Sequence, residues 1–113
     1  MSEELQVDSR DFDYVRQLRT FERMIALNPF SVSQSGQVLW MRLNGIADRQ
    51  RKSVLVHISH KDLEKLMAVT EYVRLKATYE LVALGLIKFR QGRRSNLPMY
   101  DIKLLYQEGG KTE

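Results

Sequence analysis

Two adjacent arginines, Arg93 and Arg94, lie between two short segments in which apolar and polar residues alternate. Lys88 and Arg90 occupy polar positions in the first of these segments. Alternation with a period of two is typical of a β-strand, so the two segments and the loop 92–98 between them predict a β-hairpin. Four cations on one hairpin are suited to bind the phosphates of DNA, because each phosphate that a cation neutralises releases a counterion.

Further candidate DNA contacts lie in two other segments of the chain. Apolar residues recur every three or four positions over residues 71–84, which predicts a helix directly before the hairpin. Nearer the N-terminus, residues 49–52 form a basic loop that leads into a predicted strand at 53–58. These segments add Arg74, Lys76 and Thr78 on the helix and Arg51 and Lys52 in the loop.

The elements before the hairpin are predicted from periodicity and from residues that favour helix ends. An amphipathic helix over 11–27 stops before Pro29, and a second helix begins after Ser33 and runs to residue 49. Ser59 and Thr70, eleven residues apart, are good N-caps for two short helices in succession, and Gly85 can take the left-handed conformation that ends the second. The chain therefore contains a helix-turn-helix motif followed by a hairpin.

This order of elements predicts a winged helix-turn-helix with an extra N-terminal helix, a mainly α fold with a small β-hairpin wing (α+β). We expect the domain to span residues 11–106, with a disordered segment 1–10 and a flexible tail or linker at 107–113. In such a fold the hairpin lies beside the second helix of the motif. That helix can then enter the major groove of double-stranded DNA while the hairpin reaches phosphates or the minor groove.

The helix predicted over 71–84 has two apolar faces. Val73, Ala77, Leu81 and Leu84 are expected to face inward. The adjacent face is apolar too, whereas helices that recognise base edges usually carry Arg, Asn, Gln, Ser or Thr there. We therefore expect this face to pack on the first helix or on a second copy of the chain. The candidates for self-association are Tyr72, Leu75, Tyr79 and Val82 on this helix, with Phe12 and Val15 on the first helix.

The distribution of charge agrees with a surface that faces a polyanion. The 113 residues carry a net charge of +4, but residues 31–105 alone carry thirteen basic and six acidic side chains. The segments on either side are net acidic. This pattern indicates nucleic acid as a partner, and a solvated basic surface without a partner is the alternative.

Other classes of function have little support in the sequence. There is no cysteine, His57 and His60 are the only histidines, and no glycine-rich phosphate-binding motif occurs. We therefore expect neither an enzyme nor a bound metal or cofactor. No apolar run approaches the length of a membrane-spanning helix, and the polar N-terminus does not have the pattern of a signal peptide. A cytoplasmic location is expected.

Four stretches resemble a known family: "SGQVLWMRLNGIA", "VHISHKDLEKLM", "TEYVRLKATYELVALGLIKF" and "YDI". They are similar to the N-terminal winged-helix domain of phage and prophage replication-initiation proteins, the replisome organisers, which are related to the DnaD N-terminal domain. The resemblance covers about residues 30–105 and lies mainly at hydrophobic and glycine positions. It implies a role in DNA replication initiation, self-association, and replisome proteins as further partners. Where family members often carry an arginine before the conserved alanine of the recognition helix, this chain has Lys76.

Two other interpretations remain open from the sequence. A winged helix also serves transcription regulators, and the same fold can act as a protein-interaction module, because fold alone does not determine function. Members of the resembling family continue into a second helical domain, so this chain is expected to be either a fragment or a small relative.

Overall fold

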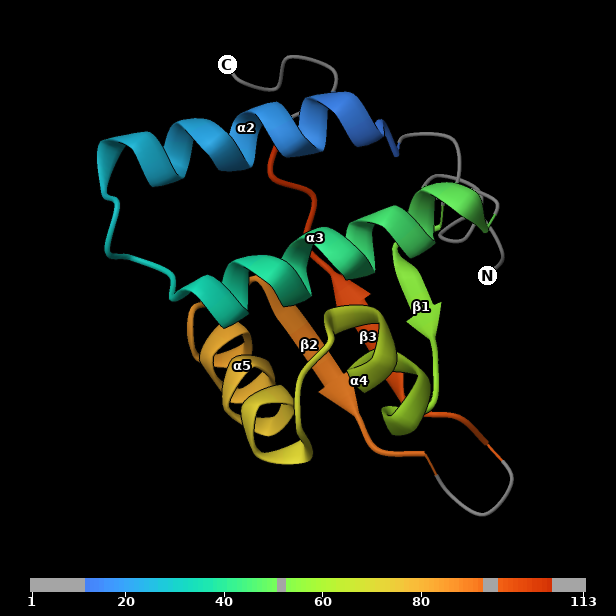
Figure 1. The fold of residues 1–113 in the computed structure, drawn as a ribbon. Helices are drawn as coiled ribbons and strands as arrows, with labels where there is room; N and C mark the ends of the chain where they lie inside the picture. Colours follow the sequence, from blue (N-terminus) through green and yellow to red (C-terminus); the bar gives the residue numbers. More distant parts are fainter. Residues whose placement is uncertain (1–11, 51–52, 93–95, 107–113) are drawn as a thin grey trace.

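The computed structural model describes residues 12–50, 53–92 and 96–106. Within these residues the chain forms four helices and a small sheet (Figure 1). The elements are α2 (Tyr14–Leu27), α3 (Gln34–Arg49), β1 (Leu55–His57), α4 (His60–Met67), α5 (Glu71–Ala83), β2 (Ile87–Arg90) and β3 (Met99–Ile102). The three strands are antiparallel in the order β1-β3-β2, so β3 is the central strand. The protein is therefore mainly helical with a small antiparallel sheet.

The predicted helix starts are confirmed by side-chain caps. The hydroxyls of Ser33, Ser59 and Thr70 each accept a hydrogen bond from the amide three residues later, at 3.1, 3.1 and 3.4 Å. These bonds satisfy amides that have no partner inside the helix. The boundaries of α3, α4 and α5 are therefore determined locally, by single residues at their N-termini.

The C-terminal ends of α4 and α5 use the same backbone geometry with different residues. Gly85 follows α5 with a φ of 78°, as predicted, and the amide of Leu86 donates to the carbonyl of Leu81. Ala68 follows α4 with a φ of 60°, and the amide of Val69 donates to the carbonyl of Glu64. The turn after α4 therefore places Ala68, a residue with a Cβ, in the left-handed region that favours glycine.

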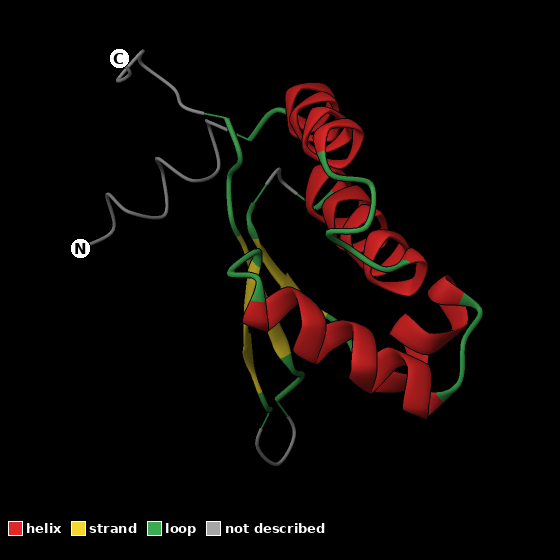
Figure 2. Cartoon of the chain, turned by 90° about the vertical axis from the view of Figure 1, so that its left-hand side faces the viewer, coloured by secondary structure: helices red, strands yellow, loops and turns green. Residues whose placement is uncertain are grey.

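Helix α3 lies at the centre of the core, as its wide apolar band predicts. Figures 1 and 2 show α2 packed along one side of α3, with the sheet and α5 on its other side. Leu39, Trp40 and Leu43 are completely buried. The ring of Phe21 from α2 stacks on Trp40 with centroids 5.4 Å apart. Below α3, Tyr100 of β3 is fully buried and packs against Phe89 of β2.

A buried glutamine attaches α2 to the segment that follows β3. The side-chain amide of Gln17 donates to the carbonyl of Lys103 at 2.8 Å, and its oxygen accepts from the amide of Leu105 at 2.9 Å. Gln17 is completely buried, so this pair of bonds continues the backbone pairing where the sheet has ended. The position of α2 is thus fixed by polar as well as apolar contacts.

The N-terminal end of the described chain also corrects one prediction. Phe12 is only 3% exposed and belongs to the core, so it is not available as a surface for self-association. Val15, predicted for the same role, is 54% exposed. Among the described helices, none is long and apolar enough to cross a lipid bilayer.

Candidate nucleic-acid interface

The hairpin formed by β2 and β3 presents two of the predicted cations to solvent. Ile87 is buried and Phe89 half-buried, whereas Lys88 and Arg90 are exposed. Because side chains two residues apart leave the same face of a strand, Lys88 and Arg90 project in the same direction. Figure 1 shows that β2 runs toward the lower side of the molecule, where the N-terminal end of α5 also lies.

The loop of this hairpin is narrow where it leaves the strands. A Cβ added to Gly92 would lie 2.1 Å from the carbonyl oxygen of Asn96, so a side chain at this position would force the loop apart. An open hollow of about 860 Å³ lies beside the narrow part of the loop at Gly92 and Asn96. His57, Arg90 and Met99 are among the residues that line it. Four predicted DNA contacts, Arg93, Arg94, Arg51 and Lys52, lie outside the described residues.

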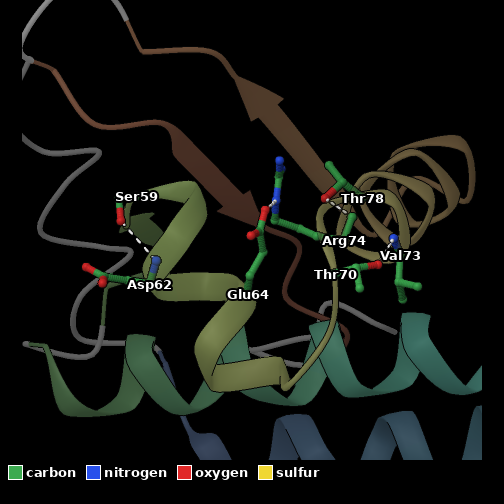
Figure 3. A network of polar contacts seen from close by, with 7 residues as sticks. All are labelled: Ser59, Asp62, Glu64, Thr70, Val73, Arg74 and Thr78. Carbon is green, nitrogen blue, oxygen red and sulfur yellow. Dashed lines mark hydrogen bonds and ion pairs between the residues drawn. The ribbon is translucent and has the colours of Figure 1, made fainter.

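Arg74 and Thr78 do not lie on the surface, so their prediction as DNA contacts is wrong. Arg74 is 2% exposed, and its Nε donates to Glu64 Oε2 of α4 at 2.7 Å (Figure 3). Thr78 is 1% exposed, and its Oγ1 donates to the carbonyl oxygen of Arg74 at 2.9 Å. The Arg74 side chain therefore joins α5 to α4, whereas the Thr78 hydroxyl bonds within α5 itself.

The burial of Arg74 follows from a rotation of α5 relative to the predicted orientation. The inward face is formed by Arg74, Ala77, Thr78 and Leu81, while Leu84 is 47% exposed. The ion pair with Glu64 stabilises the guanidinium in a site from which water is largely excluded. A partner on a neighbouring helix thus makes a charged residue acceptable in the core.

The surroundings of Arg74 also affect two titratable groups. Burial lowers the pKa of His60 from its ordinary value, and the nearby Arg74 cation lowers it further. Burial raises the pKa of the Tyr100 phenol, an effect that the Arg74 cation opposes. Within the described structure, His60 Nε2, Arg74 Nη1 and the Tyr100 hydroxyl are buried without a hydrogen-bond partner. The junction of α4, α5 and the sheet is therefore a polar region in which neutral His60 is preferred.

The outer face of α5 carries aromatic side chains and one cation. Tyr72 and Tyr79 are 68% and 65% exposed, and Val82 is 41% exposed. Lys76 is exposed between the two tyrosines, and its Nζ lies 5.6 Å from the centroid of the Tyr72 ring. Leu75 is half-buried at the edge of this face. Lys76 is thus the predicted DNA contact of α5 that does reach the surface.

The first helix does not cover this aromatic face. In the described residues α2 packs on α3 and makes no contact with α5, so the prediction that α2 would bury this face is wrong. The two views agree, because α3 lies between α2 and α5 (Figures 1 and 2). A second copy of the chain as the covering partner remains a prediction.

Contact between α5 and α3 depends on Glu80, a residue that no pattern in the sequence marked as functional. The Glu80 carboxylate accepts from the amide of Ser33 at 2.8 Å and from the Ser33 hydroxyl at 2.6 Å. Gly36 makes room for it, since a Cβ there would lie 2.4 Å from Glu80 Oε1. A glycine three residues after a serine N-cap was the signal in the sequence that another group approaches this helix end.

Neither a metal site nor a known relative assigns a function to this geometry. Among the described residues, no three His, Asp or Glu side chains are grouped so that they could hold a metal ion. Comparisons of the chain with family models, with curated proteins and with solved structures find no match. The function therefore has to be argued from the hairpin cations and the two faces of α5.

Proposed function

We propose that this chain is a DNA-binding domain with a winged helix-turn-helix fold, in which the β2–β3 hairpin is the wing and α4 and α5 are the helix-turn-helix. The observation that carries the proposal is the exposure of Lys88 and Arg90 on one face of β2, next to a loop whose sequence adds Arg93 and Arg94.

The wing is the main contact with duplex DNA in this proposal. Arg74 and Thr78 are inside the domain, and Lys76 is the one basic residue on the outer face of α5. Contacts to phosphates position a protein on DNA but carry little sequence information. We therefore expect strong dependence on salt and low sequence specificity, with each wing–phosphate contact steepening the log–log salt dependence by about 0.9.

Replication initiation is the cellular role we propose, on the basis of the resemblance to replisome organisers. Origin DNA and replisome proteins are the partners that this role implies. Transcription regulation is the alternative role, and the fold does not choose between the two.

The wing is tested by reversing its charge and comparing the result with the same reversal elsewhere. Lys88→Glu/Arg90→Glu is expected to weaken duplex DNA binding at least about tenfold and to reduce the salt slope by about 2 units. Arg19→Glu/Arg23→Glu makes the same charge change at two exposed positions of α2. Fluorescence anisotropy over a salt series measures both. Equal weakening by the two double variants would show that net charge, and not the wing, controls binding.

Self-association is a second candidate function, and a separate apolar surface favours it. Leu27, the last residue of α2, and Phe30, in the connection to α3, are 87% and 95% exposed. The sequence analysis did not single them out, because their position at a helix end next to Pro29 gives no periodic signal. Exposed apolar groups of this kind often mark contacts between proteins.

Sedimentation equilibrium up to high micromolar concentration tests this second candidate. The wild type is expected to associate, and Leu27→Ser/Phe30→Ser is expected to be monomeric. The matched variant Tyr72→Ser/Tyr79→Ser removes exposed apolar area from α5 instead. A monomeric wild type at the highest concentration would count against self-association through either surface.

A further inference from the structure

We propose that the outer face of α5 binds a single-stranded segment of nucleic acid by stacking bases on Tyr72 and Tyr79. The inference rests on the proposed function, since it names the form of nucleic acid that this surface of the domain would take. It assigns the duplex to the wing and the unpaired strand to α5.

The first step is the geometry of the two rings. Tyr72, Lys76 and Tyr79 are spaced i, i+4 and i+7, which places them along one line on a helix. This line lies opposite the buried face formed by Arg74, Ala77, Thr78 and Leu81. Because an α-helix rises 1.5 Å per residue, the two tyrosines are about 10.5 Å apart along the axis. Both rings are about two-thirds exposed, so each offers an open surface.

The second step is the chemistry that this face offers and lacks. Recognition of base edges in a major groove needs polar side chains, and Arg74 and Thr78 are buried in contacts within the domain. The flat faces of Tyr72 and Tyr79 can instead stack on bases. Bases inside a duplex already stack on each other, about 3.4 Å apart along each strand, and present no free face. A single strand, whose bases can be separated to reach both rings, is therefore the form that fits.

The third step is the charge around the rings. Lys76 lies between the tyrosines, where its ammonium group can contact a phosphate of a strand whose bases stack on either side. The acidic residue next to Tyr79, Glu80, is directed to the N-terminus of α3 by its bonds to Ser33. Glu71 is exposed beside Tyr72, so the phosphates are expected to run on the Lys76 side of that ring.

The test compares removal of the rings with removal of only their hydroxyls. Binding of a labelled oligothymidine is measured by fluorescence anisotropy, with a labelled hairpin duplex measured in parallel. Tyr72→Ala/Tyr79→Ala is expected to lose at least about fivefold in single-strand affinity for each ring. Tyr72→Phe/Tyr79→Phe keeps both rings and is expected to stay within about threefold of the wild type. Met41→Ala removes exposed apolar area from α3, outside α5, and serves as the control.

The possible outcomes separate this inference from the proposed function. If the alanine variant binds oligothymidine as tightly as the wild type, the inference is wrong. The proposal that the wing binds duplex DNA would still stand if duplex binding depends on Lys88 and Arg90. Equal losses in the phenylalanine and alanine variants would exclude stacking. If the alanine substitutions convert an oligomer into a monomer in sedimentation, the face is a contact between copies and the inference is also wrong. Failure of the wild type to bind either nucleic acid would overturn both proposals.

Discussion

The two faces of α5 each carry residues that are unusual for a helix at a protein surface. Arg74 and Thr78 are buried, while Tyr72 and Tyr79 are exposed. Both buried side chains have a partner for one polar atom: Arg74 Nε donates to Glu64, and Thr78 Oγ1 donates to the carbonyl of Arg74. The comparison shows that partners on α4 decided which side of α5 is buried, since both sides carry enough apolar surface to pack.

The largest expected effect comes from removing the partner of the buried cation. Glu64→Ala leaves Arg74 as an uncompensated charge and should lower the free energy of unfolding by about 3 kcal/mol. Arg74→Met removes the charge and fills similar space, so it should cost less than about 1 kcal/mol, because Glu64 is 21% exposed and can be hydrated. Urea denaturation measures both variants. If Arg74→Met were the more damaging substitution, the ion pair would not explain the orientation of α5.

A second pair of variants tests the turns that precede and follow α5. Ala68→Gly should raise the free energy of unfolding by about 1 kcal/mol, because glycine avoids the cost of a Cβ in the left-handed region. Gly85→Ala should lower it by a similar amount, since no atom lies within 4 Å of the added Cβ and only the backbone is affected. Thermal melts of the two variants should therefore shift in opposite directions. Shifts of the same sign would show that contacts, and not backbone conformation, dominate at one of these turns.

A smaller effect is expected from pH at the buried side of α5. The folded state holds the pKa of His60 below 6.5 through burial and the Arg74 cation, while Glu64 and Glu71 act in the opposite direction. The unfolded chain therefore binds a proton more readily, so stability present above pH 6.5 should decline as the pH falls below that value. His60→Gln should reduce this decline, as should Arg74→Met, which removes the repelling charge.

The control for this prediction is His57→Gln, which changes an exposed histidine on β1. The stability of both histidine variants and of the wild type is measured by urea denaturation at several pH values. An unchanged acid response in His60→Gln would assign the decline to other groups.

The smallest effect on stability is expected on the exposed side. Tyr72→Ser and Tyr79→Ser should each change the free energy of unfolding by less than about 0.5 kcal/mol, because both side chains are largely in solvent. A larger loss in a dilute sample would show that the rings are covered in solution. In that case both faces of α5 would be buried in solution. The measurement is therefore also a control for the binding experiments with variants of Tyr72 and Tyr79.

The features that the sequence predicted well are those that depend on a few neighbouring residues. Ser33, Ser59 and Thr70 were predicted as caps and act as caps, because the hydroxyl of each needs only the amide three residues later. The hairpin strands and Gly85 followed from alternation and from backbone freedom in the same way. The mainly helical fold with a small sheet could be assembled from these local signals.

The orientation of α5 could not be predicted in this way. With apolar residues on nearly every side, its periodicity allowed Val73 and Leu84 as inward residues equally well. Two contacts with other helices accompany the observed orientation. Arg74 donates to Glu64 of α4, ten residues earlier, and Glu80 accepts from the amide of Ser33 at the start of α3. The burial of Phe12 was missed for a related reason, since it depends on segments distant in sequence. Pairings between elements are not encoded in the periodicity of either element alone.

The carboxylate of Glu80 has one more consequence for how α5 can meet a ligand. It occupies the amide and hydroxyl of Ser33 at once, in a space that only a glycine at position 36 leaves open. Sliding or turning α5 would remove the acceptor of both Ser33 groups at the start of α3. A single strand bound to α5 as proposed would therefore meet a helix whose position is fixed against α3, and a flexible strand can adapt to such a helix better than a rigid duplex.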